Sequence, residues 1–432
     1  MDRHLTIRHR ESLVYLLCEA AELEHALMCG YLYAAFSLKE PADPGLSPEQ
    51  GECVRHWRTA VTAVAVQEML HLATVNNLLV ALGEAPHFSR PNLPVPGRYF
   101  PDTVRLGLLP FGEEALRHFL YLERPEGVER EDVGDDEALG HAIPVMADDD
   151  IAPFGQEFDT VGHLYREIRR GLDELVQAHG ECWVFIGARS QQTAGEVFQW
   201  PELAPVTDLA SARAAIDLVI EQGEGAEGDW RNGHYGQFLQ VLLELIAARD
   251  DDPSFEPARP VVPVRTRVPP GLPEQGHGAV LVTDPGTARV VDAFHVANET
   301  LLQVLSRIFG HSTETLPELG VLADTAVGLM HAVMGPLGRA LGRMPVGEHA
   351  PGATAGPTFD LFYTDGYLLP QQEAFWTILH ERLVQLAGHV ATIAAADVRG
   401  ELDAVERVLR ALADGLTVNR PDLAARFSPA TV

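Results

Sequence analysis

A carboxylate and an imidazole lie three residues apart in an otherwise apolar stretch, VAVQEMLHLATVNNLL, at residues 64–79. The apolar residues recur at intervals of three and four, which predicts a helix, and Glu68 and His71 fall on its apolar stripe. Both side chains are therefore expected inside a protein core. An unpaired carboxylate is costly to bury, so Glu68 must be protonated, paired with a cation or bound to a metal.

A Glu-x-x-His pair also occurs on helix surfaces, and in cores where the acid simply satisfies the histidine. A metal site needs more acids or histidines at the same depth. In bundles that hold two metal ions, two helices each contribute a Glu and the other two each contribute a Glu-x-x-His pair. The metal interpretation therefore depends on the remaining helices.

Four helices that could form such a bundle are predicted in the first 250 residues. They cover about 9–38, 48–82, 156–179, and a broken fourth at 211–222 and 234–249. The first is apolar nearly all round, as expected of a helix at the centre of a bundle. The break in the fourth, GEGAEGDWRNG, carries four glycines. Such an interruption inside a core helix often accompanies function.

The predicted fold is mainly α, a four-helix bundle followed by a second helical domain. Its predicted parts are a bundle at 1–250, interrupted by an irregular insertion at 86–155, a Pro-rich linker at 251–286, and a helical C-terminal domain at 287–432. Within the insertion, residues 111–123 have a helical pattern and VRLGLL is a candidate strand. In the C-terminal part, helices are predicted near 287–309, 318–343, 371–397 and 400–414.

A second acid, Glu24, is expected near the middle of the first helix and on an apolar stripe. Glu22 is nearly as surrounded by apolar residues, so periodicity leaves both acids open. Glu68 and His71 also lie near the middle of their helix. Antiparallel pairing of the first two helices would bring them level with Glu24.

The fourth predicted helix supplies an imidazole and two acids across its break. His234 begins the apolar stripe of the second half, Glu221 lies at the end of the first half, and Glu224 follows it at the start of the break. Together they could replace an unbroken Glu-x-x-His pair, although a solvated helix end is the common alternative. The third helix offers His163, opposite its apolar stripe, and Glu157, near its N-terminus. Carboxylates and imidazoles from four helices suit two iron or manganese ions.

The overall composition excludes some classes of partner. Acids outnumber bases by 62 to 32, giving a formal charge of −30. Nucleic acid and anionic membrane are poor partners for such a surface. The four cysteines show no zinc-binding or disulfide spacing. No apolar stretch approaches the roughly 20 residues that span a bilayer. A soluble, cytoplasmic protein without a membrane or nucleic-acid partner is expected.

Five blocks in the first 250 residues carry a family resemblance. They are AAELEHALMCGYLYAAFSL, AVQEMLHLATVNNLLVALGEAP, LGLLPFGEEALRHFLYLERPE, TVGHLYREI, and IEQGEG followed by HYGQF. In this order they resemble the ferritin-like domain of the iminophenyl-pyruvate dimer synthases, which couple amino-acid-derived imines in violacein and rebeccamycin biosynthesis. The chain is far shorter than those synthases. More loosely, HVANETLLQVLSRIF, MGPLGRALGRMPVG and TAGPTFD resemble the segment that follows this domain, which favours a structural or lid role there.

The resemblance implies a ferritin-like bundle and a set of metal ligands. The positions of the family's acids and histidines correspond here to Glu24, Glu68, His71, Glu221, Glu224 and His234. The family usually has an acid where this chain has His163, which leaves open the ligand from the third helix and, with it, the number of bound metal ions.

Two functions from different classes follow from this. The first is a di-iron oxidoreductase of specialised metabolism, with manganese as the other candidate metal. It would use dioxygen or peroxide, with an electron donor, to oxidise a small amine, imine or amino-acid-derived substrate. The second is a non-catalytic ferritin-like protein for metal binding, storage or scaffolding. Storage bundles are usually short single domains that form shells, whereas this chain has an insertion and a further domain. Assembly into a homo-oligomer is compatible with either function.

Overall fold

The computed structural model describes residues 5, 7–96, 105–125, 158, 160–225, 229–267, 279–310, 313–362, 371–420 and 423. The chain forms two compact units. Unit 1 comprises Met1–Ala194 and Pro201–Ala258, and unit 2 comprises Gly195–Trp200 and Arg259–Val432. The short segment 195–200 therefore belongs with the C-terminal unit although it lies within the N-terminal part of the sequence.

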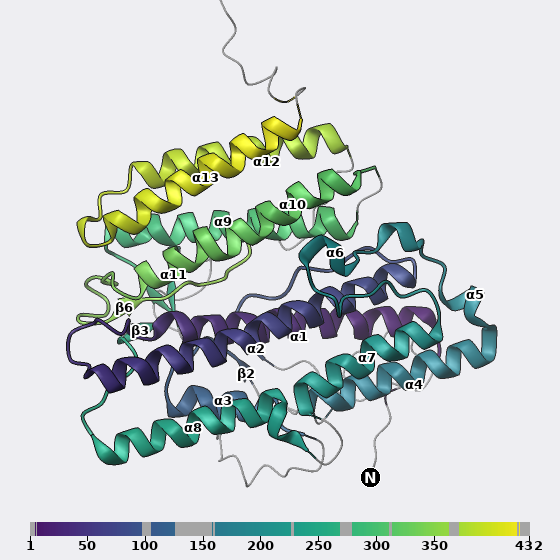
Figure 1. Ribbon diagram of the computed structural model, residues 1–432, viewed down its shortest axis with the longest axis horizontal. Helices are drawn as coiled ribbons and strands as arrows, with labels where there is room; N and C mark the ends of the chain where they lie inside the picture. The colour runs from purple at the N-terminus through teal and green to yellow at the C-terminus, as the bar shows by residue number, and fades with distance from the viewer. Residues whose placement is uncertain are drawn as a thin grey trace, which may run out of the picture. The chain divides into compact units, whose positions relative to one another are not determined.

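Unit 1 is built on two long helices that lie side by side, α1 (Arg10–Ser37) and α2 (Pro48–Ala81) (Figure 1). Helix α2 begins at a capping box, in which the Ser47 side chain accepts from the backbone N–H of Gln50 and the Gln50 side chain accepts from that of Ser47. Pro48 occupies the first helical position. These local signals explain why the observed bounds agree with the predicted ones to within a residue.

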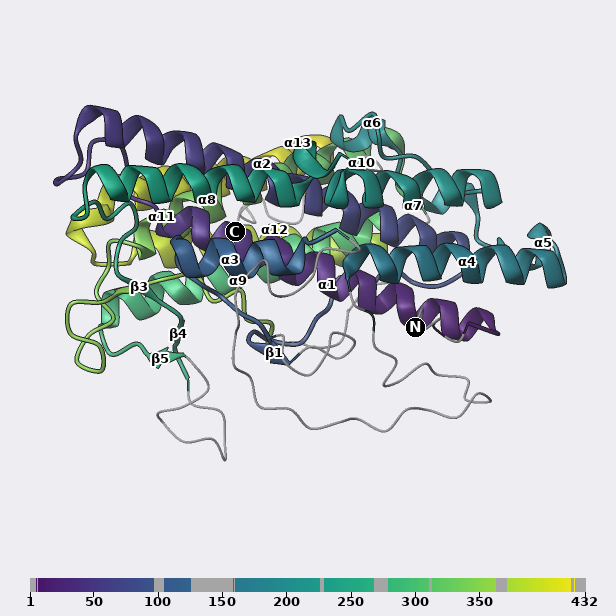
Figure 2. The ribbon, with the colours of Figure 1, turned by 90° about the horizontal axis from the view of Figure 1, so that it is seen from below.

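The other two rods of the bundle are each made of two helices. The third rod consists of α3 (Glu113–Leu122) and α4 (Val161–His179), and the fourth of α7 (Leu209–Glu224) and α8 (His234–Asp251). Figure 2 shows α3 and α4 in one row and α7 and α8 in another. Helix α3 packs against α8, and α4 against α7. Both rods are therefore broken, whereas the sequence predicted a break only in the fourth.

Local sequence explains where these helices begin and end. The side chain of Thr160 accepts a hydrogen bond from the backbone of His163 at the start of α4, and Asp208 forms a capping box with Ser211 at the start of α7. Helix α7 ends at Gly225, whose φ of +89° favours glycine. The N-cap Gly233 follows the short helix η3 (Trp230–Asn232), after which α8 resumes the rod.

Smaller elements complete unit 1. Strands β1 (Val95–Pro96) and β2 (Arg105–Leu106) pair antiparallel, so the candidate strand VRLGLL is realised only in its first part. After α4 come α5 (Glu181–Val184) and η2 (Arg189–Gln191). The segment after η2 is fixed to α2 by the buried amide of Asn77, which donates to the carbonyl of Thr193 and accepts from its N–H.

Unit 2 is also mainly helical. Its helices are α6 (Gly195–Phe198), α9 (Pro285–Phe309), α10 (Leu316–Gly328), the π-helical η4 (Leu329–Met334), α11 (Gly335–Leu341), α12 (Gln372–Ala391), η5 (Ala396–Val398) and α13 (Arg399–Asn419). Four short strands form two parallel pairs, β3 (Val261–Val262) with β6 (Thr354–Ala355) and β4 (Val264–Arg265) with β5 (Val280–Leu281). The predicted linker at 251–286 thus contains three of these strands in its described part. The mainly α fold is as predicted.

One continuous helix of unit 2, Leu316–Leu341, is long and apolar enough to cross a membrane by composition alone. Half of its most apolar window is buried inside the protein. Core helices of globular proteins have the same properties, so this is weak evidence for a membrane span.

Candidate metal centre

Five buried side chains from all four rods meet where the third and fourth rods are interrupted. Glu24 comes from the middle of α1, and Glu68 and His71 come from the middle of α2. Glu123 directly follows α3, and His234 is the first residue of α8. None of the five is more than 5% exposed. The end of α3 and the start of α8 thus lie beside the continuous helices α1 and α2.

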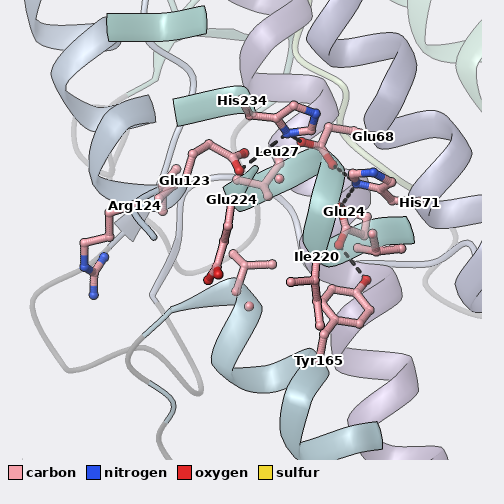
Figure 3. Close-up of a pocket in the computed structure, with 15 residues that line it drawn as sticks. Glu24, Leu27, Glu68, His71, Glu123, Arg124, Tyr165, Ile220, Glu224 and His234 are labelled. Atoms are coloured by element: carbon pink, nitrogen blue, oxygen red, sulfur yellow. Dashed lines mark hydrogen bonds and ion pairs between the residues drawn. The ribbon is translucent and has the colours of Figure 1, made fainter. Parts of the chain in front are cut away.

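The cluster has two halves that share Glu68. In one half, Nδ1 of His71 lies 2.9 Å from Glu68 Oε2 and 3.5 Å from Glu24 Oε2. In the other, Nδ1 of His234 lies 2.9 Å from Glu68 Oε1 and 3.5 Å from Glu123 Oε2. The two carboxylate oxygens of Glu68 therefore face different imidazoles, whose ring centroids are 5.4 Å apart (Figure 3).

A tyrosine hydroxyl supports the outer carboxylate in each half. Tyr165 of α4 donates a hydrogen bond of 2.5 Å to Glu24 Oε1, and Tyr31 of α1 donates to Glu123 Oε1. Both phenols are fully buried, and burial followed by the nearby carboxylates raises their pKa well above the ordinary value. The tyrosines therefore stay protonated donors that hold these two carboxylates in place.

The electrostatics of the five groups depend on burial and on one another. Burial and the charge of Glu68 raise the pKa of Glu24 to about 8, and the same two causes raise that of Glu123. Burial alone would also raise the pKa of Glu68, but His234 and His71 outweigh it and hold that pKa well below the ordinary value.

The two imidazoles show the opposite balance. Burial lowers their pKa, but the neighbouring carboxylates outweigh burial, so the pKa of His71 lies well above the ordinary value and that of His234 rises to about 9. Without metal, the charged Glu68 therefore lies between two protonated rings.

A small cavity adjoins the cluster. Its wall includes Glu24, Leu27, Glu68, His71, Leu122, Glu123, Arg124, Tyr165, Val219, Glu224 and His234. Its volume of about 20 Å³ compares with the roughly 10–15 Å³ that one water requires on the same measure. The space suits metal ions with a small ligand, such as water or dioxygen, and excludes anything as large as an aromatic ring.

The donor set fits divalent metal ions. Among the described residues, the buried atoms Glu24 Oε2 and His234 Nδ1 have only their ion-pair contacts, the first to His71 and the second to Glu68 and Glu123, and none of these contacts has the geometry of a hydrogen bond. Carboxylates and imidazoles normally form hydrogen bonds in a core. Within the two halves, the ligand atoms of Glu24, Glu68 and His71, and those of Glu68, Glu123 and His234, lie within 4.8 Å of one another. Mixed carboxylate and imidazole ligands are those that iron and manganese accept.

The family model described as ferritin-like matches residues 17–243, which is more than half of the chain and includes all five clustered residues. The chain belongs to the ferritin-like family. Its fold class is accordingly a ferritin-like bundle followed by a second helical unit.

Two curated relatives extend the likeness beyond the bundle. Dichlorochromopyrrolate synthase of Lentzea aerocolonigenes is 30% identical over 96% of this chain, but over 42% of its own length. The 2-imino-3-(indol-3-yl)propanoate dimerase of Chromobacterium violaceum is 27% identical over 81% of this chain and 34% of its own length. The chain thus spans less than half of either relative. The resemblance to enzymes that couple amino-acid-derived imines is confirmed.

A solved structure of a ferritin-like protein from Caulobacter vibrioides also aligns with the chain. It covers 75% of this chain and 95% of its own, at 18% identity and a TM-score of 0.45.

The structure brings only some of the residues predicted from the sequence into the cluster. Glu24, Glu68, His71 and His234 come together, while Glu221 is exposed at the end of α7. Their role as metal ligands stays a prediction. For Glu24, the structure also resolves the alternative left open by periodicity, because Glu22 is 19% exposed and pairs with His87 instead.

Glu224 and His163 lie near the cluster without joining it. The Glu224 carboxylate lines the cavity but pairs with Arg166, and Figure 3 shows it directed away from both imidazoles. Helix α4 allows this position because a Cβ at Gly162 would lie 1.9 Å from Glu224 Oε1. His163 is half-buried on α4, and the cavity wall contains its neighbour Gly162 rather than His163 itself. Glu157 lies outside the described residues.

Sequence reasoning missed Glu123. The signal was present, because Glu123 follows Leu116, Phe119 and Leu120 at helical intervals, and all three are buried on α3. The sequence pattern instead places 111–123 within an irregular insertion and predicts 156–179 as the whole third helix. The third rod thus places an acid in the cluster through α3 rather than through α4.

Proposed function

We propose that unit 1 holds a catalytic di-metal centre, most simply two iron ions, and that the protein is an oxidoreductase of specialised metabolism. The observation that supports this most is the sharing of Glu68 between two buried carboxylate–imidazole groups. An ordinary buried ion pair would contain only one carboxylate and one imidazole. Here the arrangement is repeated around a common carboxylate, as two adjacent ions require.

In this proposal Glu24 and His71 would hold one ion, Glu123 and His234 would hold the other, and Glu68 would be shared by the two groups. Three carboxylates carry three negative charges against four positive charges on two divalent ions. The remaining positive charge favours one more anionic ligand. Glu224, on the cavity wall, is a candidate for that place, and a small anion or the substrate is the other.

Bound iron would supply the activation of dioxygen or peroxide, provided that a coordination position stays open. The residues of this chain prepare the place for it. Tyr31 and Tyr165 orient the outer carboxylates. Leu27, Leu122 and Val219 make part of the cavity wall apolar, which limits access of water. With dioxygen as oxidant, the electrons come from the substrate or from a separate donor.

The substrate class is proposed from the relatives. One is named for an imine of an indole-bearing acid. We therefore propose an amino-acid-derived imine or amine, aromatic in character, as substrate. An indole cannot enter the cavity because the cavity has room for little more than a water-sized ligand. The organic substrate would lie outside it and meet the activated oxidant at its opening.

Metal analysis of the full chain, purified without air and loaded with ferrous iron, tests the proposal. We expect about two irons per chain and a change in the absorption spectrum when oxygen is admitted. Many irons per chain would instead support the storage alternative. A chain that takes up no iron or manganese would support a scaffold and contradict the proposal.

A further inference from the structure

Each imidazole of the cluster contacts a glutamine amide on the side of the ring that faces away from the carboxylates. Nε2 of His71 lies 3.0 Å from Oε1 of Gln222, and Nε2 of His234 lies 3.0 Å from Oε1 of Gln67. An amide oxygen can only accept a hydrogen bond. Each ring therefore keeps a proton on Nε2, which donates to the amide, and Nδ1, which faces the carboxylates, is the nitrogen whose proton a metal ion would displace.

We propose that Gln67 and Gln222 are positioning residues that fix this orientation and this tautomer, so that Nδ1 is the atom through which each ring binds metal. The inference rests on the proposed di-metal function. The nitrogen of a metal-binding histidine that does not contact the metal usually donates to a second group, which sets the orientation of the ring. The two glutamines occupy that place, one for each half of the cluster.

The two amide contacts also connect separate rods. Gln67 lies on α2 and contacts the first residue of α8, while Gln222 lies near the end of α7 and contacts His71 on α2. The contacts therefore join the second rod to the fourth on both sides of the break at 225–233. His234 is the first residue of α8. Without the contact to Gln67, the position of its ring would be set only by the backbone of the break.

A neutral amide has a chemical consequence that a carboxylate would not have. A carboxylate at Nε2 would add a negative charge and draw the proton away from the ring, which makes the ring a stronger donor to the metal. An amide accepts the same hydrogen bond without charge. With amides at both rings, the three carboxylates remain the only negative groups among the five clustered residues and their amide and tyrosine partners, which preserves the demand for a further anionic ligand.

Cobalt(II) is the probe for the test, added without air to the metal-free full chain in competition with a chelator. The variants are Gln67→Leu and Gln222→Leu, which remove the acceptor, and Gln67→Glu and Gln222→Glu, which keep one. Gln192→Leu is the matched control. Gln192 is a buried glutamine that exchanges hydrogen bonds with the backbone of Val206 and is not part of the cavity wall.

We expect each leucine variant to weaken one of two cobalt sites by about 10–100-fold. The glutamate variants should bind cobalt at least as tightly as the wild type, because they keep an acceptor and add a negative charge. Gln192→Leu should lower stability and leave both affinities unchanged. In proton spectra of the cobalt-loaded wild type, the two ring N–H groups should give two strongly shifted signals that disappear in D2O. Each leucine variant should lose or broaden a different one.

The outcomes separate this inference from the function on which it rests. A wild type that binds two cobalt ions, with leucine variants that bind them equally well and keep both N–H signals, would overturn the positioning role alone. Equal losses in the leucine and glutamate variants would also overturn it, since the glutamate variants keep an acceptor at the same position and an acceptor would then not be what holds the ring. A wild type that binds no cobalt would overturn both.

Discussion

Glu68 is the one side chain on which both halves of the cluster depend, because each of its oxygens faces a different imidazole. Glu68→Gln keeps the shape of the side chain but removes its charge. We expect the metal content to fall from about two ions per chain to below one, since neither half keeps two carboxylates. Elemental analysis after anaerobic loading checks this. A variant that still holds two ions would contradict the proposal that both groups depend on Glu68.

Two acids on α1 form a matched pair for testing the outer ligand. Glu24 is 1% exposed within the cluster, while Glu22 pairs with His87 at the edge of the bundle. We expect Glu24→Gln to weaken one metal site by about tenfold or more, because a ligand charge is lost. Glu22→Gln should bind metal as the wild type does. Metal titration of both variants distinguishes them, and equal behaviour would refute the assignment.

Metal uptake should also depend on pH. Without metal, Glu24 has a pKa of about 8 and His234 of about 9, so both hold protons at neutral pH. Metal must displace these protons, and raising the pH removes the competitor. Manganese(II) affinity should therefore rise between about pH 6 and pH 9, by about tenfold per unit for each proton displaced. Chelator competition measures it, and a flat profile would contradict these pKa values.

The residue scale also shows what periodicity can decide. Glu68 and His71 could be predicted inside because their helix has one clear apolar stripe. The choice between Glu22 and Glu24 could not be made, because α1 is apolar nearly all round and its buried face depends on its neighbours. Local spacing places Glu123 on the buried stripe of its own helix, but assigning it to the cluster required knowledge that α3 and α4 continue one rod, which is a tertiary relation with no local signal.

At the scale of elements, the break in the fourth rod is held by close backbone contacts. A Cβ on Gly233 would lie 2.5 Å from the backbone nitrogen of Gly225 and 2.7 Å from the carbonyl oxygen of Gly223. Gly233→Ala should therefore lower the free energy of unfolding by about 1–3 kcal/mol and weaken metal binding, because His234 is the next residue.

Gly320 supplies the control for that variant. It lies within α10, and a Cβ there would meet nothing within 4 Å. Gly320→Ala should raise stability by about 0.5–1 kcal/mol, since alanine restricts the unfolded chain more than glycine does. Urea unfolding and metal titration measure both variants. A Gly233→Ala protein that resembles Gly320→Ala would show that the break tolerates a side chain.

Helices could be predicted correctly where residues at their own ends mark the start and the stop. The bounds of α2 follow from the cap at Ser47, from Pro48 in the first turn and from the stop at Gly83. The glycines of 223–233 mark the break between α7 and α8. The third rod was predicted incompletely because 38 residues separate Leu122 from Val161 in the sequence. A pattern read along the chain treats such segments as unrelated, although packing aligns them.

At the scale of the whole molecule, only unit 1 contains the proposed centre. Saturating metal should slow backbone hydrogen exchange in α1, α2, α3 and α8, and leave α12 and α13 of unit 2 unchanged. The unfolding temperature of unit 1 should rise by about 5–10 °C, from the binding free energy and the size of the unit. Exchange mass spectrometry and calorimetry measure these effects. Equal slowing in α12 and α13 would contradict a centre confined to unit 1.

The paired interruptions of the third and fourth rods have an evolutionary consequence. Chain inserted after Glu123 or after Glu224 leaves and re-enters the bundle beside the cluster, so its length can change while the residues that would carry the chemistry keep their spacing. Selection could therefore alter what approaches the reactive atoms, and so the compounds that are accepted, without redesigning the reactive atoms themselves. Grafting the corresponding segments between relatives would test whether they determine substrate preference in the proposed reaction.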